Sequence, residues 1–219
     1  MISVSEQKSF DQRFSLIRTL APDKMLSQEE QTRLTIMDAG IGDSFTCFDS
    51  TYVIQEINTY QEASEDYSKL KDYFVTELTC LCLETGAVGH FEWEIDDELE
   101  VCITLDQTKF KRLTDDEGQP IDEDDLDQIV DDEDCIVYAG ETFDYDDDWA
   151  AVYRRNGKEE HVYMYEFVNS HSSLFITIEE WQDGDKEEYR IYISKPVDPA
   201  ELTLISRGEA NHEAPQPLV

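Results

Sequence analysis

The sequence predicts a mainly β (α+β) protein, with N-terminal helices followed by two duplicated five-stranded antiparallel meanders. Three observations support this class. Hydrophobic and polar residues alternate with a period of two from Gly42 onward, turn residues separate the alternating runs, and a similar order of strands occurs twice. The two meanders can form small barrels or one shared sandwich, and the sequence leaves both arrangements open.

Residues 1–39 form the predicted N-terminal helical segment. Its first part carries an apolar stripe at helical spacing, made of Phe10, Phe14, Ile17 and Leu20. Pro22 ends this part, and Ser27 followed by Glu30 is a capping-box motif that predicts a second helix over Gln28–Met37. The stripe would suit a docking partner, but such stripes more often pack on the protein's own core, which we expect here.

The first β-rich unit is predicted over residues 40–110. It begins with strands at Ser44–Phe48 and Thr51–Ile57, joined by the turn Asp49-Ser50. A long strand follows at Asp72–Leu83. Two further strands alternate cleanly, with inward side chains Phe91, Trp93 and Ile95, and then Leu99, Val101, Ile103 and Leu105.

The second β-rich unit is predicted over residues 139–206, because the pattern of the first recurs there. Gly42-Asp43-Ser44-Phe45 matches Gly140-Glu141-Thr142-Phe143, and Val101–Thr104 matches Ile191–Ser194. The predicted strands include a hairpin ending in Trp149–Arg155, then His161–Val168, Ser173–Trp181 and Glu188–Ser194. A pattern present twice indicates an internal duplication rather than a solenoid.

An acidic linker, residues 111–138, is predicted between the two units. Residues 115–148 together contain 17 acidic side chains and no Lys or Arg, a composition typical of a solvated segment. Leu126, Ile129 and Val130 interrupt it at helical spacing, so a short helix is expected over Glu123–Val130. The polar tail 207–219 is expected to be disordered.

The net charge of −35 excludes some functions. A basic groove for nucleic-acid phosphates is not expected, because such binding depends on Lys and Arg. Direct adhesion to an anionic membrane surface is disfavoured for the same reason. Strong charge often indicates disorder, but 40% of the residues are hydrophobic, which is enough for a packed core.

The cysteines and the N-terminus predict a cytoplasmic protein. Five cysteines without regular spacing do not form a disulfide framework. Cys80 and Cys82 would share one face of a strand, and we expect buried hydrophobic residues there rather than half of a metal site. The sequence begins without a secretory signal pattern and contains no apolar run of membrane-spanning length.

The sequence contains no recognisable catalytic constellation. Asp122, Asp124 and Glu133 have the spacing of EF-hand ligands, but Leu126 and Asp127 stand where an oxygen ligand and a glycine are needed. The motifs HExxH, GxSxG, Walker A and GxGxxG are missing from the sequence. We therefore expect no catalytic residues, no cofactor and no metal site, and a protein that is not an enzyme.

The repeated Gly-[Asp/Glu]-[Ser/Thr]-Phe start and the strand Phe91-Glu92-Trp93-Glu94 resemble a bacterial family of domains of unknown function, the YjfK-like proteins. The resemblance covers residues 40–205. The family has no established activity or catalytic residues, so it transfers none. Its genes tend to lie near those of phage-shock-protein-A homologues, small membrane proteins and polyamine-metabolism enzymes, which implies a role in envelope stress or in polyamine-linked processes.

We expect a non-enzymatic acidic interaction protein that binds a basic protein surface, because high charge on a foldable chain steers association with basic partners. The resemblance suggests a phage-shock-protein-A-like coiled coil as that partner. The predicted contacts are eight aspartates: Asp122, Asp124, Asp125, Asp131, Asp132, Asp146, Asp147 and Asp148.

Two other functions remain open at this point. One is a small-cation (polyamine) binding module that uses carboxylates and aromatic rings of the second unit. Its aromatic candidates are Tyr163, Tyr165, Phe167, Phe175, Trp181, Tyr189 and Tyr192. The other is a nucleic-acid mimic, in which ordered carboxylates occupy phosphate-like positions, and carboxylates on rigid elements would favour it.

Overall fold

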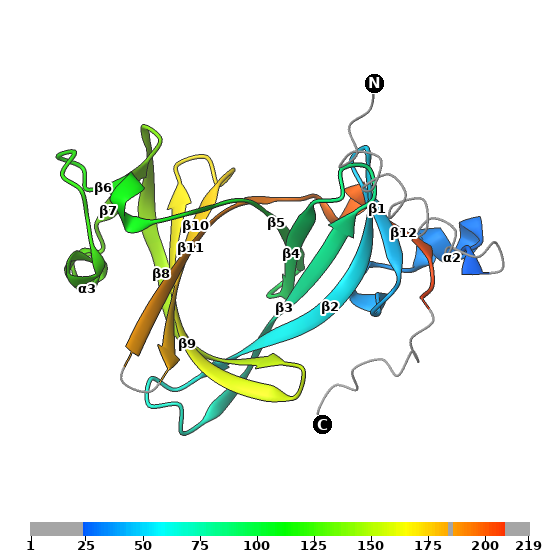
Figure 1. Cartoon of the computed structure of the whole chain (residues 1–219), viewed down its shortest axis with the longest axis horizontal. Helices are drawn as coiled ribbons and strands as arrows, with labels where there is room; N and C mark the ends of the chain where they lie inside the picture. The colour runs from blue at the N-terminus through cyan, green and yellow to red at the C-terminus, as the bar shows by residue number, and fades with distance from the viewer. Residues whose placement is uncertain (1–23, 184–185, 209–219) are drawn as a thin grey trace, which may run out of the picture. The chain divides into compact units, whose positions relative to one another are not determined.

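The computed structural model describes residues 24–183 and 186–208 of the chain (Figure 1). Strands make up 59% of the structure, which confirms the mainly β class. The predicted apolar stripe that begins at Phe10 lies outside the described residues, as does the tail beyond Gly208.

The chain divides into two compact units, each of which combines segments that are distant in the sequence. Within the described residues, the first unit contains 24–57, 77–101 and 197–208, and the second contains 58–76 and 102–196. Three strands pass from one unit into the other: β2 (Ser50–Ala63), β3 (Leu70–Cys82) and β5 (Leu99–Thr108).

The first unit is completed by strands β1 (Ser44–Cys47), β4 (Val88–Ile95) and β12 (Leu202–Ser206). Strand β1 pairs with β2 on one side and with β12 on the other. The buried ring of Phe45 stacks on Tyr52 at 5.5 Å and meets the edge of Phe91 at 5.1 Å. Alternation along β1, β2 and β4 places these rings on one face, where they form the core.

Helix α2 (Gln28–Arg33) begins at the predicted N-cap. The backbone N–H of Glu30 donates to Ser27 Oγ at 3.3 Å, and the backbone N–H of Ser27 donates to Glu30 Oε2 at 2.8 Å. Both halves of the capping box are therefore present, as the sequence predicts.

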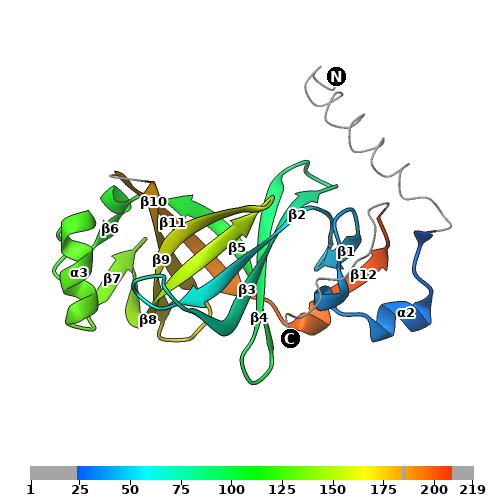
Figure 2. The same ribbon diagram turned by 90° about the horizontal axis from the view of Figure 1, so that it is seen from below.

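The prediction that this helix continues to Met37 is wrong. Leu34 adopts an extended backbone, and a separate 3-10 turn at Ile36–Asp38 follows. The turn buries the Ile36 side chain, which is 3% exposed, and this burial outweighs continuation of a helix with no buried residue of its own. Helix α2 lies beside β12 in both ribbon views (Figure 1 and Figure 2).

The second unit contains six more strands and a helix. The strands are β6 (Leu113–Thr114), β7 (Cys135–Tyr138), β8 (Glu141–Arg155), β9 (Lys158–Asn169), β10 (Phe175–Asp183) and β11 (Lys186–Pro196). The helix is α3 (Glu123–Asp131), which confirms the short helix expected in the acidic segment. In both views α3 lies beside β6 and β7 (Figure 1 and Figure 2).

The described strands form one antiparallel sheet, in the order β12-β1-β2-β3-β4-β5-β11-β10-β9-β8-β7-β6. Strands β1 to β5 are therefore neighbours in chain order, as are β7 to β11. The two series belong to one sheet because β5 pairs with β11, from Pro196 opposite Cys102 to Ile191 opposite Thr108. An additional pairing joins Thr59–Glu62 of β2 to β8.

Two hydrophobic clusters pack within the second unit. One lies under α3 and contains Leu126 together with Leu113, Ile136, Phe143, Phe167, Ile178 and other buried side chains. The other contains Tyr60, Trp149, Tyr153, Met164 and Trp181. Successive residues of β9 contribute to both, as Met164 and Tyr165 show, because neighbouring side chains along a strand point to opposite faces.

Strand β2 does not end at Ile57, as predicted, but continues to Ala63. Tyr60 and Ala63 are each 3% exposed, and the segment from Thr59 to Glu62 pairs with β8. The extension thus depends on a partner strand that lies almost a hundred residues later in the chain, which local alternation does not reveal.

The hairpin predicted before Trp149–Arg155 is also absent from the described residues. Strand β8 runs without interruption from Glu141 to Arg155, with a β-bulge between Tyr145 and Asp147 where its register with β9 shifts. A bulge accommodates an extra residue without ending the pairing, so the aspartates at this point belong to a strand rather than to a turn.

Candidate functional site

The eight predicted contact aspartates lie on two ordered elements. Asp122 is the N-cap of α3, Asp124 and Asp125 belong to its first turn, Asp131 is its last residue, and Asp132 is its C-cap. Asp146, Asp147 and Asp148 belong to β8. All except Asp148 are exposed, so the segment predicted to be solvated is indeed open to solvent but is also structured.

Helix α3 forms because hydrogen bonds cap its first turn and one of its side chains is buried. Asp122 Oδ1 accepts a hydrogen bond from the backbone N–H of Asp124 at 3.1 Å, and Asp125 Oδ2 accepts one from that of Asp122 at 3.0 Å. Carboxylates in the first turn also interact favourably with the helix dipole. Leu126 is the buried residue that fastens the helix to the unit's core.

Asp148 differs from the other seven aspartates. It is half-buried, and its two carboxylate oxygens accept hydrogen bonds from the hydroxyl groups of Tyr145 and Tyr163. Burial and the bond to this carboxylate raise the pKa of Tyr163. Asp148 therefore links a tyrosine of β8 to a tyrosine of β9. Its charge is less available to a partner than that of the exposed Asp146.

The charge of residues 115–148 is not neutralised locally. Fourteen of its 17 carboxylates are exposed, and none forms an ion pair with the described residues. We call these 14 side chains the acidic surface: Asp116, Glu117, Asp122, Glu123, Asp124, Asp125, Asp127, Asp131, Asp132, Glu133, Asp134, Asp144, Asp146 and Asp147. Such a concentration of one sign of charge attracts basic molecules over distances of about a Debye length.

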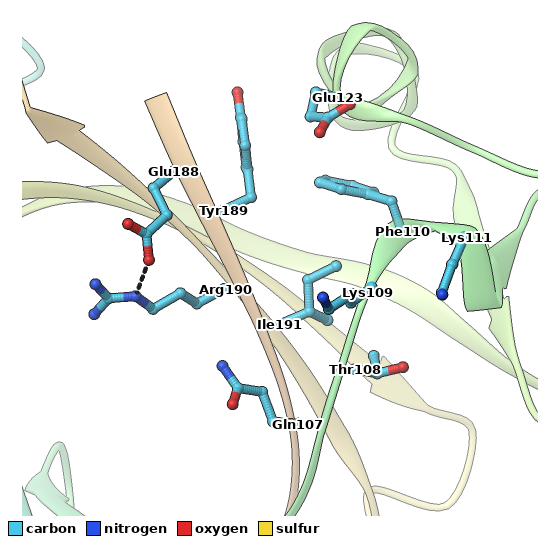
Figure 3. A pocket seen from close by; sticks show the side chains of 10 residues that line it. All are labelled: Gln107, Thr108, Lys109, Phe110, Lys111, Glu123, Glu188, Tyr189, Arg190 and Ile191. Atoms are coloured by element: carbon cyan, nitrogen blue, oxygen red, sulfur yellow. Dashed lines mark hydrogen bonds and ion pairs between the residues drawn. The ribbon is translucent and has the colours of Figure 1, made fainter. Parts of the chain in front are cut away.

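A cavity of about 650 Å³ lies in the second unit, where β5 ends beside β11; we call it the β5–β11 cavity (Figure 3). Its lining residues are Gln107, Thr108, Lys109, Phe110, Lys111, Glu123, Glu188, Tyr189, Arg190 and Ile191. Pairing between the two strands stops at Ile191 opposite Thr108, and the chain then turns through a 3-10 helix at Phe110–Arg112. The cavity is therefore a consequence of β5 leaving the sheet.

Three of the side chains at the cavity are basic. Arg190 is already engaged, because its Nε donates to Glu188 Oε1 at 2.8 Å and its guanidinium lies 4.5 Å from the Trp181 ring centroid. Lys109 and Lys111 have no ion pair within the described part of the chain. Two ammonium groups are thus available at the β5–β11 cavity.

Thr108 is an unusual polar residue in the wall of this cavity. It is 6% exposed, and its Oγ1 has no hydrogen-bond partner among the described residues. A buried polar group without a partner costs about 1–3 kcal/mol, so most such groups are satisfied. The hydroxyl of Thr108 therefore has unused hydrogen-bonding capacity, but protein atoms enclose it and it is not open to the β5–β11 cavity.

The sequence predictions missed the β5–β11 cavity, although a signal for it is present. Lys109-Phe110-Lys111-Arg112 places three of the chain's 17 basic residues in four positions, among 52 acidic residues. Arg112 is held by the neighbouring elements, since its Nη1 lies 3.9 Å from Asp106 Oδ2 and its guanidinium 5.7 Å from the Tyr138 ring.

The aromatic side chains considered for cation binding lie largely inside the protein. Phe167, Tyr165 and Trp181 are each less than 8% exposed. Arg190 of the same unit already covers the ring of Trp181, and the indole N–H donates to the buried carboxylate of Glu179 at 2.7 Å. These rings therefore serve the hydrophobic clusters, in keeping with the preference of aromatic residues for strands.

Buried cysteines occupy the first unit, where Cys80 and Cys82 are both less than 6% exposed. Burial raises the pKa of the Cys80 thiol. No three His, Cys, Asp or Glu side chains of the described residues come together as metal ligands. Nor is any described helix long and apolar enough to cross a membrane.

The fold defines a mainly β protein with one continuous antiparallel sheet and a structured acidic segment. The chain belongs to the family described as "Domain of unknown function (DUF4178)", whose profile matches residues 40–199. Comparison with curated proteins and with solved structures gives no significant match. The expected membership in a family of unknown function is thus confirmed, and the chemistry must be argued from the residues themselves.

Proposed function

We propose that this protein is a non-catalytic binding protein whose acidic surface contacts a basic protein. The observation that carries the proposal is that 14 carboxylates are exposed, eight of them within α3 or β8, without a compensating cation among the described residues. A group of charges that the protein's own side chains do not neutralise is available to those of a partner.

The fixed positions of these carboxylates matter for binding as much as their charge does. Asp124, Asp127 and Asp131 project from a helix whose position Leu126 sets, and Asp146 projects from β8. A partner that binds a preformed array does not have to order it first, so less of the interaction energy is lost as conformational entropy. An ordered array also selects partners by the spacing of their basic residues.

The proposal also includes a particular kind of partner and a compartment. The resemblance to YjfK-like proteins points to a phage-shock-protein-A-like coiled coil as the basic partner, in the cytoplasm. Long coiled coils present Lys and Arg at regular intervals along their exposed positions, which suits an array of carboxylates on a rigid helix. Ordered carboxylates also support the nucleic-acid-mimic variant of the proposal, in which DNA competes for the same basic protein.

Titration calorimetry with the full chain and a purified phage-shock-protein-A coiled coil tests the proposal. The informative variant is Asp124→Asn, Asp127→Asn and Asp131→Asn combined, since these exposed side chains take no part in the capping box. The matched control is Asp72→Asn, Asp97→Asn and Glu98→Gln combined, which removes the same charge at exposed positions elsewhere.

The affinity is expected to fall steeply between low and moderate salt, and to fall further in the α3 variant than in the control. A labelled DNA duplex that displaces the protein from the coiled coil would identify the partner's DNA-binding surface as the contact. Binding that is insensitive to salt, or that the two variants weaken equally, would contradict the acidic surface as the contact.

A further inference from the structure

We infer that the β5–β11 cavity binds a small organic anion, a carboxylate or phosphate group carried on an apolar body. This site adjoins the acidic surface, with which it shares Glu123, and its charge preference is the opposite. The juxtaposition of two ammonium groups that form no ion pair with the described residues and an aromatic wall supports it.

The anionic group is recognised by the lysines. Phe110 is 9% exposed and packs edge-on against Tyr189 at 5.4 Å, so the 3-10 turn that carries it is fastened to β11. Lys109 and Lys111 flank Phe110 in the chain and are consequently held at the cavity (Figure 3). Ammonium groups form strong, charge-assisted hydrogen bonds with carboxylate and phosphate oxygens.

The balance of charge at the cavity favours an anion over a cation. Its lining includes two carboxylates, but Glu188 is paired with Arg190. The remaining charges are two ammonium groups against the single carboxylate of Glu123, which leaves the cavity locally positive. In a chain of net charge −35 a locally positive place is unusual, because the carboxylates elsewhere on the protein repel anions.

The remaining wall selects the body of the ligand. Phe110 and Tyr189 line the cavity beside the lysines and offer aromatic surface, with the buried Ile191 behind them. A volume of about 650 Å³ falls within the range of small-molecule sites, roughly 300–1,000 Å³. Inorganic phosphate alone would leave this surface unfilled, so an anion with a ring or short chain is expected to bind more tightly.

Four probes of known chemistry test the site on the full chain at about 0.15 M salt, where distant carboxylates are screened. Phenyl phosphate and benzoate carry an anionic group on a ring, inorganic phosphate lacks the ring, and benzylamine reverses the charge. Amide chemical shifts in a ¹⁵N-labelled sample report where each binds. Phenyl phosphate or benzoate is expected to shift residues 107–111 and 188–191 at lower concentration than inorganic phosphate, and the ratio of their affinities distinguishes a phosphate from a carboxylate preference.

Variants tie the effect to the named groups. Lys109→Gln combined with Lys111→Gln is expected to weaken the tighter ring-bearing anion at least tenfold, whereas Lys158→Gln, at the exposed first residue of β9, is expected to leave it within twofold.

Three results would overturn the inference. One is that neither ring-bearing anion shifts the cavity residues at millimolar concentration. Another is that benzylamine shifts them as strongly as phenyl phosphate does. The third is that the double lysine variant, folded as judged by its amide spectrum, binds as tightly as Lys158→Gln. None of these results bears on the acidic surface, whose test uses different variants and a protein partner.

Discussion

Leu126→Ala is expected to release helix α3 from the protein and to weaken binding through the acidic surface without removing a charge. Leu126 is 1% exposed and belongs to the larger hydrophobic cluster of the second unit. The change removes Cγ, Cδ1 and Cδ2 from this buried site, and about 0.8 kcal/mol for each carbon amounts to about 2.4 kcal/mol. The cavity left behind raises the expected loss of unfolding free energy to about 3 kcal/mol.

The other contacts of the helix are weaker, because Ile129 and Val130 pack against the same cluster but are only partly buried. It is 9 residues long, below the roughly 12–15 residues at which isolated helices become marginally stable. Asp127 lies one turn from both Glu123 and Asp131, and each such pair of like charges destabilises a helix by about 0.2–0.5 kcal/mol. Without Leu126 the capping box and the partly buried Ile129 and Val130 would have to offset these repulsions, so α3 is expected to unfold locally or fray.

Urea denaturation followed by tryptophan fluorescence measures the loss, because Trp149 and Trp181 both lie in the second unit. Leu105→Ala is the matched control: the same atoms are removed from a side chain that is 51% exposed, so about 1 kcal/mol or less should be lost. A loss at Leu126→Ala below 1 kcal/mol, or equal to that of the control, would refute the anchoring role.

Two further predictions concern single buried groups. Burial and the charges of nearby carboxylates raise the pKa of Glu94 to about 7. The folded state therefore binds this proton more tightly than the unfolded chain does, and stability falls as the pH rises from about 4 to 7. Glu94→Gln should raise the unfolding free energy above pH 7 by about 1 kcal/mol, after allowance for solvent screening, with the gain vanishing near pH 4. Denaturation across this pH range checks it, and an equal gain at every pH, or one shared by Glu98→Gln at an exposed site, would count against it. Tyr60→Phe should cost about 1.5–3 kcal/mol in urea denaturation, because its hydroxyl donates at 2.8 Å to the buried carboxylate of Glu179; an unchanged midpoint would show that this bond adds no net stability.

Local signals in the sequence predicted local structure well. The Ser27–Glu30 capping box is present, and the spacing of Leu126, Ile129 and Val130 correctly indicates helix α3. Strands β3 and β4 also lie close to their predicted positions. These features depend on side chains within a few residues of one another, so the sequence carries them directly.

The sequence did not predict features that depend on pairing between strands distant in the chain. The length of β2 depends on its pairing with β8, and the continuity of β8 depends on the register with β9, which tolerates a bulge at the aspartates. The β5–β11 cavity exists because two strands separated by more than seventy residues pair only as far as Thr108. The basic run at Lys109 was visible in the sequence, but nothing local indicates that it borders a cavity.

The sequence by itself determined the mainly β class, the charge of residues 115–148 and the presence of a helix within them. Only the tertiary structure decided that this acidic segment is ordered, because its order depends on Leu126 entering a core built from β6 to β11. The tertiary structure also placed two lysines, which form no ion pair with the described residues, beside an aromatic wall. Period and spacing report which face a side chain occupies, whereas the neighbours it meets are set by strand pairing across the whole chain.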